Sequence, residues 1–352
     1  MEDVIIIGAG LSGLATARAL TQRRVSVRLL EGRDRPGGRV LSTEAGVDLG
    51  PSWIWPGQNR VLALTSALGL EVFPQPTAGD LVFDRGSGQV QRGKFDAHGG
   101  AHRTRGGVAT WIEALVDLLP DAVLKLGHVV RELKDGAEGV RVTVDTSEGT
   151  THFHARQVVL ALPPRVMLNI RRTPDWTPGE AAGLARISTW MASEAKLVAT
   201  YSEPFWRSAG LSGDAFSPGV LGQVWDATTA SGEAALGAFV RLDAEARQRL
   251  GVERLKEAGV AQLAELFGSG ARRPKEVQIH DWYTEPLTAT GADAQRPAGH
   301  PDYRPPFAPV LWDGRLILSG TELAPDAGGY LEGALASSEA TIAAIRAPEA
   351  RP

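Results

Sequence analysis

The sequence predicts an α/β protein, and three observations lead to this fold class. A β-branched run at residues 4–7 is followed by glycines and a helical pattern, as in a parallel sheet buried on both faces. A second strand–loop–helix pattern closes the chain at 315–345. Between them, short strands dominate residues 195–282, which is typical of a separate antiparallel sheet.

Composition favours a globular protein with a small-molecule partner. The chain has 352 residues, 43% of them hydrophobic and 22% charged, which is enough for a sizeable core. Its net charge is −4 and it has no long basic run, so we expect no nucleic-acid partner. No apolar run approaches the roughly 18 residues that span a bilayer. The apolar start lacks a basic leader, so we expect a cytoplasmic protein.

Cysteine is absent from the sequence. Its absence excludes disulfides, thiolate metal ligands and thiol nucleophiles, and it fits a reducing compartment. No metal site is predicted.

The glycines after the first strand have the spacing of a dinucleotide-binding turn. Gly8 permits the tight turn, Gly10 lets the backbone approach a pyrophosphate, and Gly13 lets helix and strand pack closely. The helix amino terminus offers free N–H groups and a partial positive charge to phosphates. This pattern predicts a Rossmann-like unit whose turn contacts the nucleotide through Gly8, Gly10, Leu11, Ser12 and Gly13.

A second predicted strand, 25–30, ends in Glu31, whose carboxylate can accept hydrogen bonds from an adenosine ribose. Residues 31–39 read E-G-R-D-R-P-G-G-R, and residues 48–53 read D-L-G-P-S-W. Two adjacent glycines flanked by arginines can bring backbone amides and a guanidinium to a diphosphate. A nicotinamide dehydrogenase does not need this second phosphate-side loop.

These segments resemble the flavin-containing amine oxidases, the monoamine oxidase and polyamine oxidase family, which carries E-x-R-x-x-x-G-G-R and then D-L-G-x-x-W. The resemblance covers nearly the whole chain in order and implies FAD as the cofactor. Without cysteine, the FAD cannot have a cysteinyl link. By this resemblance Glu31 holds the ribose. The other implied cofactor-binding residues of these segments are Gly32, Arg33, Gly38 and Arg39 near the diphosphate and Gly50, Pro51, Ser52 and Trp53 near the isoalloxazine ring.

The middle of the chain is shorter than the family pattern. Residues 71–105 are rich in glycine and polar residues, where the family usually has a larger helical substrate module, and this sequence keeps only a remnant. A helix is predicted at 110–119, followed by strands at 122–133 and 140–146. The family places a backbone contact to adenine in the first strand, here at Val129. His154 is expected to be an ordinary strand residue.

Lys196 lies in a strand pattern at 195–201. From the residues alone, a solvent-facing lysine is favoured. The resemblance implies the opposite, because in the family a lysine shortly before an E-P-F-W segment hydrogen-bonds through water to flavin N5. An ammonium there would stabilise negative charge on reduced flavin or assist its reaction with oxygen.

The resemblance also implies an aromatic site. Trp282, in a D-W-Y-T-E-P segment, corresponds to the tryptophan that packs beside the flavin. Many members form a cage of two aromatic side chains around the substrate amine. Tyr330 matches one of them, but Asp293 stands where the other is expected. Tyr283 and Tyr303 are candidates to replace it, and the sequence leaves this open.

The carboxy-terminal pattern is a strand at 315–318, an S-G-T-E segment, a glycine pair and a helix from 330 to about 345. In the family pattern, the glutamate accepts a hydrogen bond from the ribityl chain. The helix amino terminus points at the N1–C2 edge of the flavin, where its dipole stabilises the reduced anion. The implied cofactor-binding residues are Gly320, Glu322, Gly329, Tyr330 and Leu331, together with Trp282.

We therefore expect a Rossmann-like FAD-binding domain assembled from discontinuous segments and a mixed α+β substrate domain. The FAD-binding segments are 1–70, 104–168 and 288–352, and the substrate segments are 71–103 and 169–287.

The implied function is an FAD-dependent amine oxidase that transfers hydride from an amine α-carbon to flavin N5, with O2 reoxidation to H2O2. Lys196, Trp282 and Tyr330 are its predicted catalytic residues. Two alternatives stay open: a flavin desaturase or dehydrogenase acting on a non-amine substrate, and a flavin-binding protein without turnover.

Overall fold

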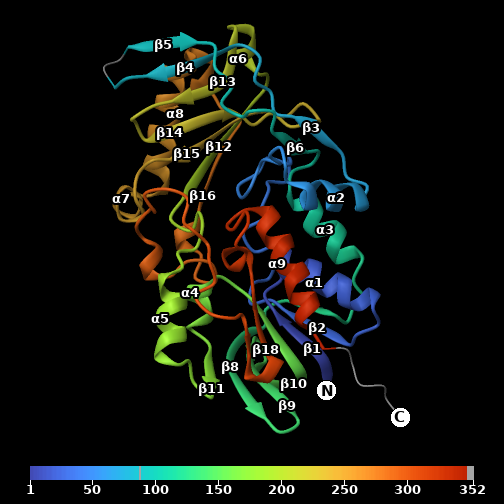
Figure 1. The fold of residues 1–352 in the computed structure, drawn as a ribbon. Coiled ribbons are helices and arrows are strands. Elements are labelled where there is room, and N and C mark those ends of the chain that lie inside the picture. Colours follow the sequence, from blue (N-terminus) through green and yellow to red (C-terminus); the bar gives the residue numbers. More distant parts are fainter. Residues whose placement is uncertain (87–88, 347–352) are drawn as a thin grey trace.

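The computed structural model describes residues 1–86 and 89–346, so the last six residues of the predicted segment 288–352 lie outside the described part. The molecule is elongated, with a nine-stranded sheet at one end and a seven-stranded sheet at the other (Figure 1). Both helices and mixed sheets are present, which confirms the α/β fold class. No helix of the described residues is long and apolar enough to cross a membrane.

The nine-stranded sheet combines a parallel core with an antiparallel extension. In the core, β10 pairs in parallel with β1 on one side and with β18 on the other, so strands from both ends of the chain meet there. The core strands are β18 (Leu316–Ser319), β10 (Gly149–Ala161), β1 (Glu2–Ile7), β2 (Val27–Leu30) and β7 (Leu124–Lys125). The remaining strands are β8 (Val129–Gly136), β9 (Gly139–Thr146), β11 (Arg171–Thr173) and β17 (Val310–Leu311).

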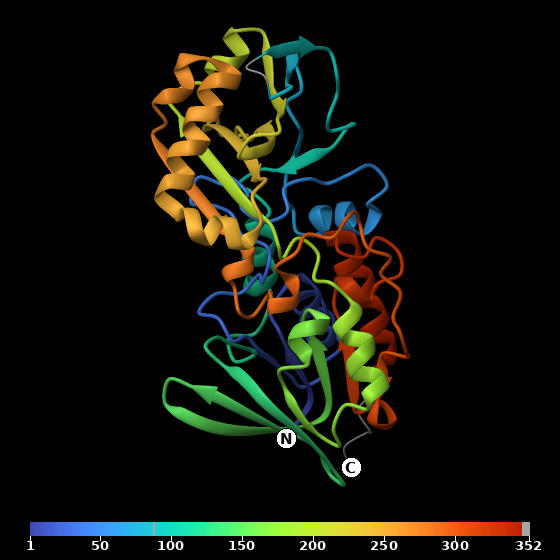
Figure 2. The ribbon, with the colours of Figure 1, turned by 90° about the vertical axis from the view of Figure 1, so that its left-hand side faces the viewer.

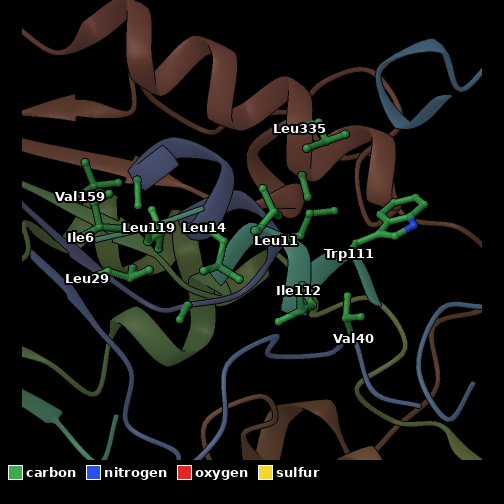
Figure 3. Close-up of a cluster of buried hydrophobic side chains, with 14 of the residues drawn as sticks. Ile6, Leu11, Leu14, Leu29, Val40, Trp111, Ile112, Leu119, Val159 and Leu335 are labelled. Atoms are coloured by element: carbon green, nitrogen blue, oxygen red, sulfur yellow. The ribbon is translucent and has the colours of Figure 1, made fainter. Parts of the chain in front are cut away.

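Helices bury one face of the parallel core. Side chains of Ile6, Leu29 and Val159 point from the sheet into a cluster that includes Leu14 and Leu335 (Figure 3). Helices α1 (Leu11–Gln22), α3 (Ala109–Asp117) and α9 (Leu331–Ala344) supply much of this cluster, and α2 (Asn59–Ala67) adds Val61. The opposite face is also buried, beneath a segment that contains α4 (Pro164–Met167) and α5 (Pro178–Arg186). Burial on both faces explains why these strands read as continuous apolar runs.

The seven-stranded sheet is antiparallel except for the pairing of β13 with β4. Helix α8 (Val252–Phe267) packs on one face of this sheet (Figure 2). Gly259 leaves room there for the side chain of Leu197. Short helices α6 (Phe205–Ser208) and α7 (Ala244–Leu250) complete this part. In spatial order the strands are β16 (Glu276–Asp281), β12 (Ala195–Tyr201), β15 (Ala234–Val240), β14 (Leu221–Asp226), β13 (Leu211–Phe216), β4 (Asp80–Asp84) and β5 (Val90–Gly93).

Smaller elements join the two sheets. Helix α2 (Asn59–Ala67) and the two-stranded sheet of β3 (Val72–Pro74) and β6 (His102–Thr104) lie between them (Figure 1). The 3-10 helices are η1 (Ser269–Arg272), η2 (Trp282–Thr284), η3 (Gly291–Asp293), η4 (Trp312–Gly314) and η5 (Thr321–Leu323).

Two details differ from the expected pattern. The single strand predicted at 122–133 is two strands, because the chain turns at Gly127, whose φ is +66°, and β7 and β8 then pair with different neighbours. Strand β11 belongs to the predicted substrate segment 169–287, yet it pairs with β8 in the nine-stranded sheet. The division into two domains at the predicted boundaries stays a prediction.

Helix α2 has no side-chain cap of its own, and a carboxylate from α9 takes that place. Glu332 is buried and accepts hydrogen bonds from the backbone N–H groups of Arg60, at 3.1 Å, and Val61, at 3.0 Å. Because these are unpaired amides of the first turn, the carboxylate satisfies them and interacts favourably with the helix dipole. The carboxy-terminal helix therefore fixes the position of α2.

We predict that Glu332→Ala lowers the free energy of unfolding by about 1–2 kcal/mol, because the α2 amides lose their acceptor. The matched control is Glu339→Ala on the same helix, whose carboxylate is exposed and pairs with the Arg60 side chain. Such surface pairs contribute less than about 1 kcal/mol. Urea denaturation of both variants measures the difference, and equal losses would contradict a capping role for Glu332.

Candidate active site

A cavity of about 360 Å³ lies between the carboxy-terminal helix α9 and strands β12 and β15 of the seven-stranded sheet. It brings together segments that lie far apart in the sequence. The predicted site residues that line it are Leu11, Arg39, Gly50, Pro51, Ser52, Trp53, Lys196, Trp282, Gly329, Tyr330 and Leu331.

The glycine turn has the geometry that a nucleotide phosphate requires. Gly8 has a φ of +103°, and an added Cβ would lie 2.4 Å from the carbonyl oxygen of Ala161. At Gly13 an added Cβ would lie 2.0 Å from the carbonyl oxygen of Gly8, so strand and helix meet closely. Gly10 caps α1 and has open space where a side chain would be. The first amides of α1 therefore border a space that an anion can enter.

The second glycine loop lies against this turn. The N–H of Gly37 donates to the carbonyl oxygen of Ala9 at 2.8 Å, and Gly38 approaches the Cα of Gly10. Gly38 has a φ of +57°, a conformation that favours glycine. Two runs of backbone amides thus converge at one point, which fits a diphosphate.

Glu31 and Arg33 lie at the end of β2, outside the cavity. The Glu31 carboxylate accepts hydrogen bonds from the N–H of Ala9 at 2.9 Å and from that of Arg33 at 3.0 Å. The Arg33 guanidinium donates to Glu285, at 3.1 Å, and to Thr288, at 2.7 Å. Arg33 thereby ties this end of β2 to the 285–288 segment.

Gly32 packs under the same segment, and Val129 lies beside it. An added Cβ at Gly32 would lie 2.7 Å from the Leu287 side chain and 3.4 Å from that of Val129. Ser12 contacts the carboxy-terminal strand instead, with its hydroxyl 3.0 Å from that of Ser319. The N–H of Gly320, the next residue, donates to the hydroxyl of Ser337 at 2.9 Å.

Arg39 and Glu322 form a buried ion pair at the cavity wall. The Arg39 Nη2 donates to Glu322 at 3.0 Å, and its Nη1 donates to the carbonyl oxygen of Trp190 at 3.1 Å. The N–H of Trp190 donates back to Glu322 at 3.1 Å. Burial by itself lowers the pKa of Arg39, but the Glu322 charge outweighs it and raises the pKa. The pair joins the second glycine loop to the carboxy-terminal segment.

Lys196 is buried, not solvent-facing. Its Nζ donates to the carbonyl oxygen of Gly50 and, at 3.0 Å, to the hydroxyl of Ser52. The Nζ also lies 5.6 Å from the Trp53 ring centre, 5.1 Å from that of Trp225 and 5.2 Å from that of Phe239. These distances are typical of cation–π contacts. Three aromatic rings and two oxygen acceptors therefore surround the amino group.

Burial lowers the pKa of Lys196 from its usual 10.5 to about 7. The Asp48 carboxylate opposes this shift, and the Arg103 guanidinium adds to it. Asp48 is itself buried, which raises its pKa, and it accepts hydrogen bonds from Ser42 at 2.7 Å and from the N–H of Val108 at 2.8 Å. The amino group can therefore exist with or without its proton near neutral pH.

The aromatic walls differ from the expected cage. Trp282 is buried and its indole N–H donates to the carbonyl oxygen of Leu49 at 3.1 Å. Neither Tyr283 nor Tyr303 is among the described residues that line the cavity, and the Tyr303 hydroxyl donates to the carbonyl oxygen of Ser188. Trp190 lines the cavity instead, with its ring 6.3 Å from that of Tyr330.

Asp293 faces away from the cavity and has a structural role. Its carboxylate accepts hydrogen bonds from the Arg165 side chain at 2.5 Å, the N–H of Thr189 at 3.1 Å and the N–H of Thr290 at 2.9 Å. Asp293 thus anchors the segment that leads into Trp190. A short acidic side chain serves this purpose, whereas an aromatic one would not.

Several cavity residues were not predicted from the sequence. Glu194 lies two residues before Lys196, so strand alternation could have placed it on the same side. Phe239 lies directly opposite Lys196 on β15, a pairing that no local pattern reveals. Others with no sequence signal are Trp55, Gln58, Trp190 and Met191.

The chain matches the family model of flavin containing amine oxidoreductases over residues 11–98 and 90–345. A Mycobacterium tuberculosis protein assigned as the flavin-containing monoamine oxidase AofH is 28% identical over 98% of this chain and 96% of its own. The flavin-containing amine oxidase B of Rattus norvegicus is 25% identical over 96% of this chain and 84% of its own. These alignments span more than 450 positions, 454 for the first, so the relatives carry segments that this chain lacks.

Solved structures show the same fold. A putrescine oxidase variant has a TM-score of 0.82 at 23% identity, with 98% of each chain covered. The cyclohexylamine oxidase of Brevibacterium oxydans has a TM-score of 0.82 at 22% identity, again with 98% of each chain covered.

The lowered pKa of Lys196 predicts a pH-dependent stability. Between about pH 7 and pH 10.5 the unfolded chain keeps a proton on this lysine that the folded protein has released. The free energy of unfolding should therefore rise with pH in this window. Lys196→Met cannot titrate, so its stability advantage over the wild type should shrink as the pH rises. Urea denaturation across the window measures this, and a constant difference would mean that the folded lysine stays protonated.

Proposed function

The chain belongs to the family of flavin-containing amine oxidoreductases, and from this premise we propose that it oxidises a small amine, bound uncharged, with O2 as the electron acceptor. It is an FAD-dependent oxidoreductase of the amine oxidase type. The observation that carries the proposal is the meeting of Lys196, Trp282 and Tyr330 in one cavity beside the glycine-rich phosphate turn.

The residues of both chain ends would hold the cofactor. The amides around Gly10 and Gly38 suit the diphosphate, and Glu31 suits the adenosine ribose. Glu322 and the walls formed by residues 50–53 would hold the flavin end. The chain has no cysteine, so the FAD is held without a cysteinyl bond. When bound, FAD supplies the hydride acceptor, at N5, and the site at which oxygen becomes peroxide.

The cavity walls favour an uncharged amine. Trp53, Trp190, Phe239, Trp282 and Tyr330 all line it, and such an apolar lining disfavours the ammonium form. A neutral nitrogen keeps the lone pair that assists removal of hydride from the α-carbon. The same rings exclude water from the reacting carbon.

Two groups of the chain can stabilise negative charge that develops in the cavity. The Nζ of Lys196 can carry a proton near neutral pH and is fixed by Gly50 and Ser52. The amino terminus of α9 borders the cavity at Tyr330 and Leu331, with no side chain of the described residues capping it. Its free amides and dipole favour an anion there.

The first test is cofactor binding and substrate class. Purified protein should carry or take up FAD, bleach with amines under anaerobic conditions and recolour in air with release of peroxide. A panel of primary amines, secondary amines and reduced nicotinamides distinguishes an amine oxidase from a dehydrogenase of other substrates. Bleaching by non-amines alone would overturn the proposal, and FAD binding without any bleaching would favour a protein without turnover.

The second test is Lys196→Met, which removes the amino group and keeps an apolar side chain of similar length. We expect FAD binding to survive and flavin reoxidation by O2 to slow by about a hundredfold, as for removal of one preorganised charged group. Stopped-flow absorbance measures reduction and reoxidation separately. The matched control is Lys275→Met, an exposed lysine on the same sheet. Unchanged rates in both half-reactions would exclude a catalytic role for Lys196.

A further inference from the structure

A second cavity, of about 900 Å³, adjoins the proposed active site, because Met191, Glu194 and Phe239 line both. We propose that it binds the remote end of an elongated amine substrate, and that this end is anionic. The inference rests on the proposed amine oxidation and adds the class of amine.

The floor of this cavity is a row of side chains across the seven-stranded sheet. Directly paired residues of neighbouring strands point to the same face. Lys196 pairs with Phe239, which pairs with Gln223, and Gln223 pairs with Phe216. Phe216 in turn pairs with Phe83. With strands about 4.8 Å apart, the row extends about 19 Å from Lys196 to Phe83.

This row is largely apolar. The rings of Phe83 and Phe216 stack, with centres 6.0 Å apart and planes 23° apart. Phe83 is 37% exposed, although it is a large apolar side chain. Exposed apolar side chains grouped along a concave surface are typical of a ligand-binding groove. The row therefore suits the apolar body of an extended ligand.

Arginines lie along one side of the row. Arg241 follows Phe239 by two residues and Arg85 follows Phe83 by two, so each lies one residue beyond the end of its strand and about 7 Å from its phenylalanine. The pairings show that β15 and β4 run in the same direction, so both arginines lie on the same side of the row. Figure 1 shows β4 and β5 at the far edge of this sheet.

The charge of the cavity is positive, in contrast to the chain as a whole. Its described lining holds four arginines and two carboxylates, whereas the chain has a net charge of −4. Both carboxylates already have partners: Asp84 accepts from Ser217 at 2.7 Å, and Glu194 pairs with Arg296. Arg85 has no hydrogen-bond or ion-pair partner within residues 1–86 and 89–346, and Arg241 donates only to the carbonyl oxygen of Pro218.

This arrangement discriminates between classes of amine. A diamine would place its second ammonium beside unpaired guanidinium groups, with no free carboxylate to accept it, and like charges in proximity are costly. An α-amino acid would need a free cation next to the reacting carbon, but in the described lining of the smaller cavity Arg39 is paired with Glu322 and the Lys196 amino group already donates to Gly50 and Ser52. An amine with a carboxylate, sulfonate or phosphate at its far end satisfies both conditions.

The test compares three substrates of equal length with the FAD-loaded protein: ω-aminooctanoate, octylamine and diaminooctane. We expect kcat/KM to be highest for the amino acid and about tenfold lower for the diamine, with the gap shrinking at high salt. Equal values, or a preference for the diamine, would overturn the inference and leave amine oxidation standing.

Two variants identify the residues. In the double variant Arg85→Glu and Arg241→Glu, kcat/KM for ω-aminooctanoate divided by kcat/KM for octylamine should fall by about tenfold. The control, with Arg254→Glu and Lys256→Glu, makes the same change in net charge on α8, which covers the opposite face of the sheet. In the control, the same ratio of kcat/KM values should stay at the wild-type value. An equal fall in the double variant and in the control would mean that the net charge of the protein sets the ratio, and it would overturn the assignment to Arg85 and Arg241.

A binding measurement keeps the inference testable without turnover. Octanoate, which lacks the amine, should bind the FAD-loaded wild type in calorimetry and bind the double variant more weakly. If octanoate binds in this way while none of the three amines bleaches the flavin, the proposed function fails and the anion site stands. If octanoate binds neither protein, the anion site is wrong.

Discussion

The pairing of β10 with β1 on one side and with β18 on the other is the constraint on which the rest of the structure depends. Parallel strands in one sheet place their carboxyl ends at the same edge. Gly8 follows β1 and Gly320 follows β18, so the glycine-rich turns of both chain ends open at that edge. The proposed FAD site therefore depends on sheet order and not on sequence proximity.

A second constraint comes from the other sheet, which supplies Lys196. Strand β12 is buried along its whole length, and its lysine can be accommodated only because Gly50, Ser52 and three aromatic rings surround the amino group. A glycine makes this possible: an added Cβ at Gly237 would lie 2.6 Å from the Trp225 ring, so only glycine lets that ring lie over β15. Burial among these side chains thus lowers the pKa of Lys196.

A third feature is the part of the seven-stranded sheet beside the larger cavity. Relatives of this chain carry segments that it lacks. The face of the seven-stranded sheet that bears Phe83, Phe216 and Phe239 borders the larger cavity. In the proposed function, charge and apolar area on this face would select among amines.

The sequence by itself determined the parts that depend on local spacing. The glycine turn, the strands of both ends, helix α8 and strand β12 follow from short-range periodicity, and their bounds agree closely with the structure. The positions of Arg39, Trp53 and Tyr330 at the cavity followed from motifs matched to a family.

Only the tertiary structure decided which side chains are buried and which groups they contact, because strand pairing and long-range hydrogen bonds determine both. The residues around Lys196 favoured a solvent-facing lysine, but the neighbours across the sheet bury it. Asp293 became a backbone anchor because Arg165 and the N–H of Thr189 reach it, and Trp190 took a cavity position that no motif marks. Glu332, next to the cavity residue Leu331, caps α2 through the N–H groups of Arg60 and Val61. Such roles depend on contacts between residues that lie far apart in the sequence, and the local spacing of residues does not predict these contacts.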